Sequence, residues 1–288
     1  MNIQTNYLHR QNQYGESYRI SYSAWGNPNA SRSLVCVHGL NRNSRDFDFV
    51  ADYLLNCDDY FIIAPDLPGR GNSDYLQDPR GYNLESSVAD LIAVLMHLAL
   101  PNPDFIGVSF GGILGMILAS MPQKWFHKLI LSDIGAEVEL AGIARIAAYS
   151  YEQPDFATFA AAGNYLRSLS SSDGIYAEAV WQHMLLNSLQ KNSAGHWGIK
   201  RDVRLVQALA GEGLPAGNIK FWFYWEKIKL PTLIIHGQQS DLLSSATITK
   251  MMEGNPSTQL LTVLDAGHSP YLYREEQLKV IAEFLQAE

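Results

Sequence analysis

Short apolar segments alternate with longer amphipathic segments along most of the chain. The short segments span residues 34–37, 61–64, 104–108, 128–131, 233–235 and 260–264. Most of them are apolar at consecutive positions, which is typical of parallel strands that helices cover on both faces. Residues 18–23 alternate polar and apolar side chains instead, as an antiparallel edge hairpin does. The pattern therefore predicts an α/β fold with a mostly parallel sheet.

Helical periods fill the intervals between the predicted strands. Apolar residues spaced by four and three mark one face of residues 84–98, after Asn83 as a suitable N-cap, and residues 278–285 repeat this period. The alternation stops after residue 134, and no strand is predicted until residue 219. So long a segment is not an unstructured loop. We expect a core of residues 1–134 and 220–288, interrupted by an all-helical cap at residues 135–219.

Composition and charge exclude several classes of protein. The 288 residues are 47% hydrophobic and 17% charged, which excludes wholesale disorder. The formal net charge is −8, without a basic block, so a nucleic-acid partner is not expected. The two cysteines, Cys36 and Cys57, stand in no metal-binding or disulfide spacing. We expect neither a metal nor a cofactor.

The N-terminal segment and the longest apolar segment bear on localisation. Residues 1–15 lack the apolar stretch of a signal peptide. Residues 106–121 are too few, and too interrupted by glycine, to span a bilayer. The sequence therefore predicts a soluble, cytoplasmic protein, and it leaves open whether this is a monomer or a homodimer.

The segment with the most chemical content is Gly107-Val-Ser109-Phe-Gly111-Gly112. It follows the strand predicted at residues 104–108 and opens a predicted helix. In that context a GxSxG segment forms a nucleophile elbow, a strained turn that lifts the serine hydroxyl clear of the sheet. Larger side chains in place of the glycines would collide in so tight a turn. The context favours Ser109 as a nucleophile over a serine in an ordinary glycine-rich turn.

Acyl transfer also requires two fixed N–H donors for the oxyanion that forms. The backbone N–H of Phe110, the residue after the nucleophile, is one candidate. The loop after His38-Gly39 offers the other, the N–H of Leu40. We interpret His38 as a residue that orders this loop and assign it no proton transfer.

Two more polar residues lie just after predicted strands. Asp241 follows the strand at residues 232–236, and His268 follows the strand at residues 259–264. The chain order Ser109, Asp241, His268 is the order expected of a serine hydrolase on an open α/β sheet, where the chemistry lies at the carboxyl ends of the strands. The roles complement each other: the serine attacks, the histidine takes its proton and the aspartate orients the imidazole.

The sequence resembles the α/β-hydrolase fold superfamily in its capped, esterase- and lipase-like branch. The resemblance covers essentially the whole chain outside the cap and rests on His38-Gly39, the Asp66-Leu-Pro68-Gly69-Arg-Gly71-Asn-Ser73 turn, the elbow, Asp241 and Gly267-His268. It implies an eight-stranded sheet with the cap inserted after the sixth strand. Some relatives place the catalytic acid after that strand, which makes Asp133 the alternative acid. The commoner position, after the seventh strand, favours Asp241.

Differences from other enzymes of this fold reduce the number of reactions that the sequence favours. Position 109 is serine, whereas dehalogenases and epoxide hydrolases of this fold use an aspartate nucleophile. Ring-cleavage carbon–carbon hydrolases typically follow His-Gly with a glycine-rich, proline-containing loop, and here Leu40-Asn-Arg-Asn follows. The lipase-like His-Gly-Gly-Gly motif is also absent.

These observations predict a serine hydrolase that cleaves an ester bond of a small to medium, largely apolar substrate through an acyl-enzyme. Trp181, Trp197 and Arg42 are candidate residues of the substrate pocket. A carbon–carbon hydrolase, lactonase or acyltransferase with the same triad is an alternative. A ligand-binding protein that keeps the fold but has little turnover is another, because fold alone does not determine function.

Overall fold

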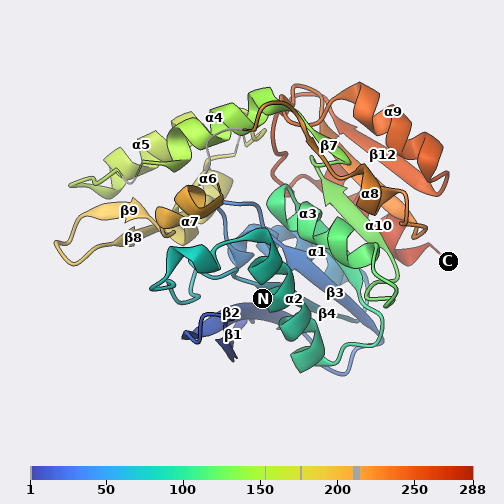
Figure 1. Ribbon diagram of the computed structural model, residues 1–288, viewed down its shortest axis with the longest axis horizontal. Coiled ribbons are helices and arrows are strands. Elements are labelled where there is room, and N and C mark those ends of the chain that lie inside the picture. Colours follow the sequence, from blue (N-terminus) through green and yellow to red (C-terminus); the bar gives the residue numbers. More distant parts are fainter. Residues whose placement is uncertain (1, 153, 176, 210–214, 288) are drawn as a thin grey trace.

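One twisted sheet organises the molecule (Figure 1). Within residues 2–152, 154–175, 177–209 and 215–287, which the computed structural model describes, this sheet has eight strands in the order β1-β2-β4-β3-β5-β6-β11-β12. In chain order they are β1 (Gln4–Gln11), β2 (Ser17–Gly26), β3 (Arg32–Val37), β4 (Tyr60–Pro65), β5 (Asp104–Val108), β6 (Leu129–Ser132), β11 (Thr232–Gly237) and β12 (Thr258–Val263). β2 pairs antiparallel with β1 and β4, and the strands from β4 to β12 are parallel. The predicted parallel sheet with an antiparallel edge is confirmed.

Helices cover both faces of the sheet, which explains why its central strands are apolar at consecutive positions. Val35 and Phe105 point into one helical layer, whereas the adjacent Leu34 and Ile106 point into the other. The first layer holds α2 (Leu84–Leu98), α3 (Phe110–Ala119), α8 (Trp222–Trp225) and α9 (Ser245–Gly254), and the second holds α1 (Asp48–Cys57) and α10 (Glu275–Gln286). The short 3-10 helices η1 (Ser44–Phe47) and η2 (Pro79–Gly81) lie in loops. The predicted N-cap of α2 is also confirmed, because the Asn83 side chain accepts a hydrogen bond from the N–H of Ser86.

Between β6 and β11 the chain leaves the sheet and forms a group of elements at its side, called the insertion below (Figure 1). In chain order these are β7 (Glu137–Val138), α4 (Leu140–Ser150), α5 (Phe159–Leu169), α6 (Glu178–Ser188), β8 (Leu189–Lys191), β9 (Trp197–Ile199), α7 (Arg204–Leu209) and β10 (Ile219–Lys220). The expectation of an all-helical segment is therefore wrong. β8 and β9 form a hairpin, and β7 pairs with β10. Strands of two or three residues are too short to show a period of two in the sequence.

The insertion has a hydrophobic core of its own. Trp181, Met184 and Leu185 of α6 are buried there together with Leu166 of α5. Tyr271, from the loop after β12, joins the same cluster. The insertion is thus packed onto the part of the core that follows the last strand.

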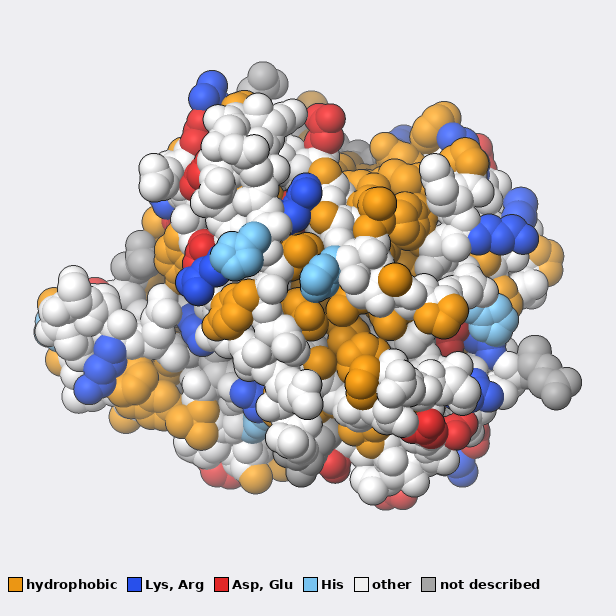
Figure 2. Space-filling model, turned by 90° about the horizontal axis from the view of Figure 1, so that it is seen from below, with side chains coloured by type: hydrophobic (Ala, Val, Ile, Leu, Met, Phe, Trp, Pro, Cys, Tyr) orange, Lys and Arg blue, Asp and Glu red, His pale blue; other side chains and the backbone are white. Residues whose placement is uncertain are grey.

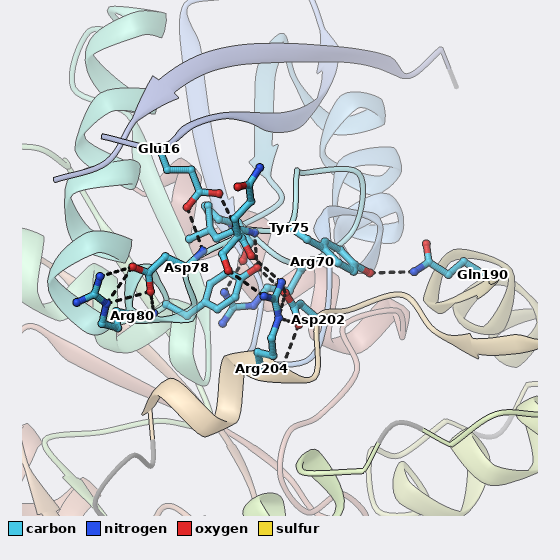
Figure 3. A network of polar contacts seen from close by, with 12 residues as sticks. Glu16, Arg70, Tyr75, Asp78, Arg80, Gln190, Asp202 and Arg204 are labelled. Carbon is cyan, nitrogen blue, oxygen red and sulfur yellow. Dashed lines mark hydrogen bonds and ion pairs between the residues drawn. The ribbon is translucent and has the colours of Figure 1, made fainter. Parts of the chain in front are cut away.

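A polar network fastens the segment of the insertion after β9 to the core (Figure 3). The Asp202 carboxylate accepts hydrogen bonds from the Tyr82 hydroxyl at 2.8 Å and from the Arg204 guanidinium at 2.6 Å. Arg204 also donates to the backbone carbonyl of Leu76 at 2.6 Å. The backbone N–H of Asp202 donates to the carbonyl of Gly69 at 2.8 Å. The residues just after β9 are therefore held by the core itself.

Figure 2 shows how charged and apolar side chains are distributed on one face of the molecule. On the face shown in Figure 2, acidic and basic side chains lie mostly around the rim, and apolar side chains gather near the middle. Among the described residues, no helix is long and apolar enough to cross a membrane. In the same part of the chain, no His, Cys, Asp and Glu side chains gather into a group of three suited to a metal ion.

Candidate active site

Ser109 lies in the tight turn between β5 and α3, as predicted. Its backbone adopts φ 50° and ψ −115°, a left-handed conformation that is strained for a residue with a side chain. The N–H of Ser109 donates to the carbonyl of Ser132 at 2.9 Å, so the turn is fixed to the neighbouring strand β6. The geometry is that of a nucleophile elbow.

The glycines of the elbow are required by close backbone approach. A Cβ atom at Gly111 would lie 2.1 Å from the carbonyl oxygen of Val37, and one at Gly107 would lie 2.5 Å from the backbone of Gly112. A Cβ at Gly112 would lie 2.3 Å from the side chain of Ile134. None of these distances is compatible with a real side chain, which explains the spacing of the three glycines.

His268 connects Ser109 with Asp133. Its Nε2 lies 2.9 Å from the Ser109 Oγ, and its Nδ1 lies 2.8 Å from the Asp133 Oδ2. Asp133 comes directly after β6 and His268 lies in the loop after β12, so both are at the carboxyl edge of the sheet. An imidazole between a hydroxyl and a carboxylate is the arrangement that activates a serine nucleophile.

The Asp133 carboxylate is fully buried and well supplied with donors. It accepts hydrogen bonds from the N–H of Gly237 at 2.9 Å and from the Ser240 hydroxyl at 2.6 Å, and His236 lies 3.3 Å away. Burial opposes ionisation of this carboxyl, but the hydrogen bonds from His236, His268 and Ser240 outweigh it and lower the pKa of Asp133. The group is therefore a carboxylate at neutral pH.

Asp241 does not contact the imidazole, so the prediction that it orients His268 is wrong. Its carboxylate is held by Arg145 of α4 in a bidentate ion pair of 2.6 and 2.8 Å. After β11 the chain turns so that Ser240, not Asp241, faces Asp133. Asp133 directly follows β6, and Asp241 lies in the first turn after β11. The sequence around them therefore contained no local signal that distinguished the catalytic acid from the other aspartate. The arginine that occupies Asp241 comes from the insertion, far away in the sequence.

The loop after β3 lies beside Ser109, as expected for an oxyanion site. A Cβ atom at Gly39 would be 3.6 Å from the Cβ of Ser109. Arg70 donates to the carbonyl of Leu40 at 2.9 Å, and its guanidinium lies 5.7 Å from the centre of the Phe110 ring. Phe110 is the first residue of α3, where a backbone N–H has no partner within the helix.

His38 orders this loop, in line with its predicted role. Its Nδ1 lies 2.7 Å from the carbonyl of Gly39, and its Nε2 accepts a hydrogen bond from the N–H of Leu67 at 3.0 Å. The residue is fully buried, and burial lowers the pKa of His38 to about 3. The ring is thus neutral and engaged at both nitrogens.

A cavity of about 90 Å³ opens beside Ser109 and His268, between the core and the insertion. Its apolar wall consists of Leu40, Ile146, Leu166, Leu169 and Ile199. Its polar wall includes Arg42, Arg145, Arg201 and Asp173. The lining is therefore mixed and carries charge, whereas the sequence predicts a largely apolar substrate. The sequence showed no signal for the last three of these charged residues, because the fold of the insertion brings them to the site.

The candidate pocket residues separate into two groups. Arg42 lines the cavity and forms a bidentate ion pair with Asp46 at 2.7 Å. Trp181 packs inside the insertion, where its Nε1 donates to the carbonyl of Ile175, and Trp197 meets the edge of the Phe159 ring at 5.0 Å. Neither tryptophan is among the residues that line the cavity. Both stabilise the insertion.

A model of the alpha/beta hydrolase fold family matches residues 32–275. The chain belongs to the α/β-hydrolase family. This confirms the resemblance seen in the motifs, and this α/β hydrolase has the mostly parallel sheet and flanking helices of its relatives.

Several relatives resemble this α/β hydrolase over most of their length. It is 34% identical to the 3-hydroxybutyrate-oligomer hydrolase of Cupriavidus necator over 273 residues, 93% of this chain and 92% of that protein. It is 27% identical to the 2-hydroxy-6-oxo-2,4-heptadienoate hydrolase of Pseudomonas putida over 79% of each chain. A crystal structure of a hydrolase candidate from Rickettsia typhi superposes with a TM-score of 0.90, at 31% identity and with 100% of both chains covered.

Proposed function

We propose that this α/β hydrolase cleaves carboxylic ester bonds through Ser109, His268 and Asp133. The observation that carries the proposal is the hydrogen-bonded chain from the Ser109 hydroxyl through His268 to the Asp133 carboxylate, next to a cavity. An imidazole in this position takes the serine proton as a general base, and the buried carboxylate stabilises the imidazolium. In this proposal Asp133 has the role that the sequence assigned to Asp241.

The reaction proceeds in two halves. Ser109 Oγ attacks the ester carbonyl carbon while its proton moves to Nε2 of His268. The tetrahedral intermediate collapses, and the departing alkoxide takes that proton from Nε2 and leaves as the alcohol. A water molecule then gives a proton to Nε2 and attacks the acyl-enzyme. This attack forms a second tetrahedral intermediate. When this intermediate collapses, Ser109 Oγ leaves, takes the proton back from Nε2, and the acid is released.

The oxyanion of both tetrahedral intermediates is assigned to the backbone N–H groups of Leu40 and Phe110. The Arg70 guanidinium supports this assignment because it holds the carbonyl of Leu40 and lies over the Phe110 ring. Loss of one such donor typically lowers kcat by about 10²- to 10³-fold. The proposal assigns both oxyanion hydrogen bonds to backbone N–H groups and none to a side chain.

The substrate class follows from the relative and from the cavity together. The relative with 34% identity is named for the hydrolysis of 3-hydroxybutyrate oligomers, which are esters of a hydroxy acid. Three arginines and an aspartate in the cavity wall suit a polar ester better than a long acyl chain. We therefore propose short hydroxy-acid esters as substrates, with residues 135–219 acting as the cap that selects them.

Carbon–carbon hydrolysis is the second candidate reaction. The relative with 27% identity is named for the hydrolysis of 2-hydroxy-6-oxo-2,4-heptadienoate. In this second proposal Ser109 and His268 act as nucleophile and base on the carbon–carbon bond. Ring-cleavage carbon–carbon hydrolases typically have a glycine-rich, proline-containing loop after His-Gly, whereas Leu40-Asn-Arg-Asn follows His38-Gly39 here. This favours ester cleavage.

Product analysis tests the proposal. Purified wild type and Ser109→Ala are incubated with the dimer and trimer of 3-hydroxybutyrate and with 2-hydroxy-6-oxo-2,4-heptadienoate, and intact mass is measured after treatment with a serine-directed phosphonate. We expect release of 3-hydroxybutyrate by the wild type only, with one phosphonyl group on Ser109. Cleavage of the dienoate alone would replace ester hydrolysis by the carbon–carbon reaction. Absence of both turnover and labelling would overturn the serine mechanism.

A further inference from the structure

Arg201 is a buried cation that lines the cavity. It is 2% exposed, and among the described residues it forms no ion pair. Its two Nη atoms donate to the backbone carbonyls of Ser150 at 2.9 Å and Glu152 at 3.1 Å, where α4 ends. Its Nε is buried and has no hydrogen-bond partner within the described part of the chain. A buried charge in this state costs free energy unless an anion compensates it.

The other two arginines of the cavity wall are already neutralised. Arg42 pairs with Asp46, and Arg145 pairs with Asp241. Asp202 is next to Arg201 in the sequence, but its carboxylate pairs with Arg204 and accepts a hydrogen bond from Tyr82 of the core. Of the described arginines that line the cavity, Arg201 is therefore the one whose charge no carboxylate neutralises.

Arg201 is held in a fixed position before any ligand arrives. Its backbone forms a β-bridge with Arg70 of the core. The adjacent Asp202 belongs to the polar network that fastens the insertion (Figure 3). A donor placed in advance loses little conformational freedom when it binds an anion.

A second unused donor lines the same cavity. Ser188, the last residue of α6, is 6% exposed, and its hydroxyl has no hydrogen-bond partner among the described residues. Its backbone carbonyl accepts from the N–H of Lys200 at 2.8 Å, which places it beside the segment that carries Arg201. A hydroxyl and a guanidinium N–H are together suited to the two oxygens of a carboxylate.

We propose that Arg201 and Ser188 form a subsite that binds a free carboxylate of the substrate. The inference rests on the proposed ester hydrolysis, because Ser109 lines the same cavity. It specifies the substrate class: hydroxy-acid esters that keep one ionised terminal carboxyl group. Neutral esters of equal length bind without this contact.

A matched pair of substrates tests the subsite. The dimer of 3-hydroxybutyrate and its terminal carboxamide have nearly the same size and differ at one end, where the amide has no charge and carries a donor in place of one acceptor oxygen. The ratio kcat/KM is measured for both. In the wild type we expect the acid to be favoured by about tenfold or more, through KM, since hydrogen bonds to charged groups exceed neutral ones. Arg201→Met should bring the ratio close to one, Arg201→Lys should keep part of it, and Ser188→Ala should reduce it. Arg80→Met, which removes an exposed positive charge elsewhere, should retain the wild-type ratio.

Failure of the subsite and failure of the proposed function give different results. If the wild type cleaves both dimers with equal kcat/KM, the subsite is overturned and ester hydrolysis stands. If neither dimer is cleaved, the measurement becomes inhibition of p-nitrophenyl acetate hydrolysis. The two inhibitors compared are 3-hydroxybutyrate and its amide. Equal inhibition by the two would overturn the subsite. If Arg201→Met lowers Tm but leaves the acid-to-amide ratio of kcat/KM unchanged, the proposal is also overturned. Arg201 would then only stabilise the end of α4.

Discussion

The carboxylate of Asp133 lies 2.8 Å from Nδ1 of His268, and the two residues come from loops that follow β6 and β12. β11 lies between these strands and closes the arrangement, because the N–H of Gly237 and the Ser240 hydroxyl both donate to Asp133. The carboxylate that faces the imidazole is thus fixed by donors from the last residue of β11 and from the turn after it. This relationship makes the identity of the catalytic acid testable.

Replacing Asp133 by asparagine should nearly abolish turnover. The amide N–H₂ would face Nδ1 and favour the wrong imidazole tautomer, so we expect kcat to fall by about 10⁴-fold with a smaller change in KM. Asp241→Asn is the matched control, since it removes a carboxylate at the same edge of the sheet that is held by Arg145. Steady-state kinetics on one ester substrate measure both. A larger loss in Asp241→Asn than in Asp133→Asn would return the acid role to Asp241.

Replacing Gly111 by alanine should destabilise the fold. The new methyl group would lie 2.1 Å from the carbonyl oxygen of Val37, and backbone cannot yield as a flexible side chain does. Such overpacking typically costs about 1–3 kcal/mol or more. Urea unfolding monitored by tryptophan fluorescence gives the free energy of unfolding. In Gly198→Ala the added Cβ would lie 3.6 Å from the carbonyl of Pro154, so this control should unfold much as the wild type does. Equal stabilities for the two variants would contradict the packing account.

Asp173 should make stability depend on pH around neutrality. It lines the cavity, and burial raises the pKa of its carboxyl to about 7, against the opposing effect of Arg42. Between the usual value of 3.8 and about 7, the unfolded chain releases this proton while the folded protein keeps it. The contribution of Asp173 to the free energy of unfolding therefore falls as pH rises through this window and levels off above it.

Asp173→Asn removes this titration. Its Tm relative to the wild type should rise from pH 5 to pH 8, measured by differential scanning fluorimetry in matched buffers. Asp59→Asn, at an exposed site, serves as the control and should show no such trend. A Tm difference for Asp173→Asn that is constant across pH would show that the carboxyl is ionised throughout.

The sequence by itself determined the layers of the fold and the elbow. Consecutive apolar residues such as Leu34 and Val35, repeated between helical periods, are typical of parallel strands that helices cover on both faces. The elbow is recorded locally in the spacing of Ser109 and its glycines, although Gly111 and Gly112 also need that spacing to clear Val37 and Ile134 from other segments. These features depend on periodicity and on backbone sterics, which short stretches of sequence record.

Only the tertiary structure decided between Asp133 and Asp241 and brought charged side chains into the lining of the cavity. Both aspartates stand at the same edge of the sheet, and the choice depends on Ser240, Arg145 and the path of the turn after β11. Arg201 likewise reaches the cavity from the segment of the insertion just after β9. Hydrogen bonds and ion pairs between residues about a hundred positions apart leave no periodic trace in a single sequence, since any donor in the chain can satisfy a carboxylate once the fold brings the two together.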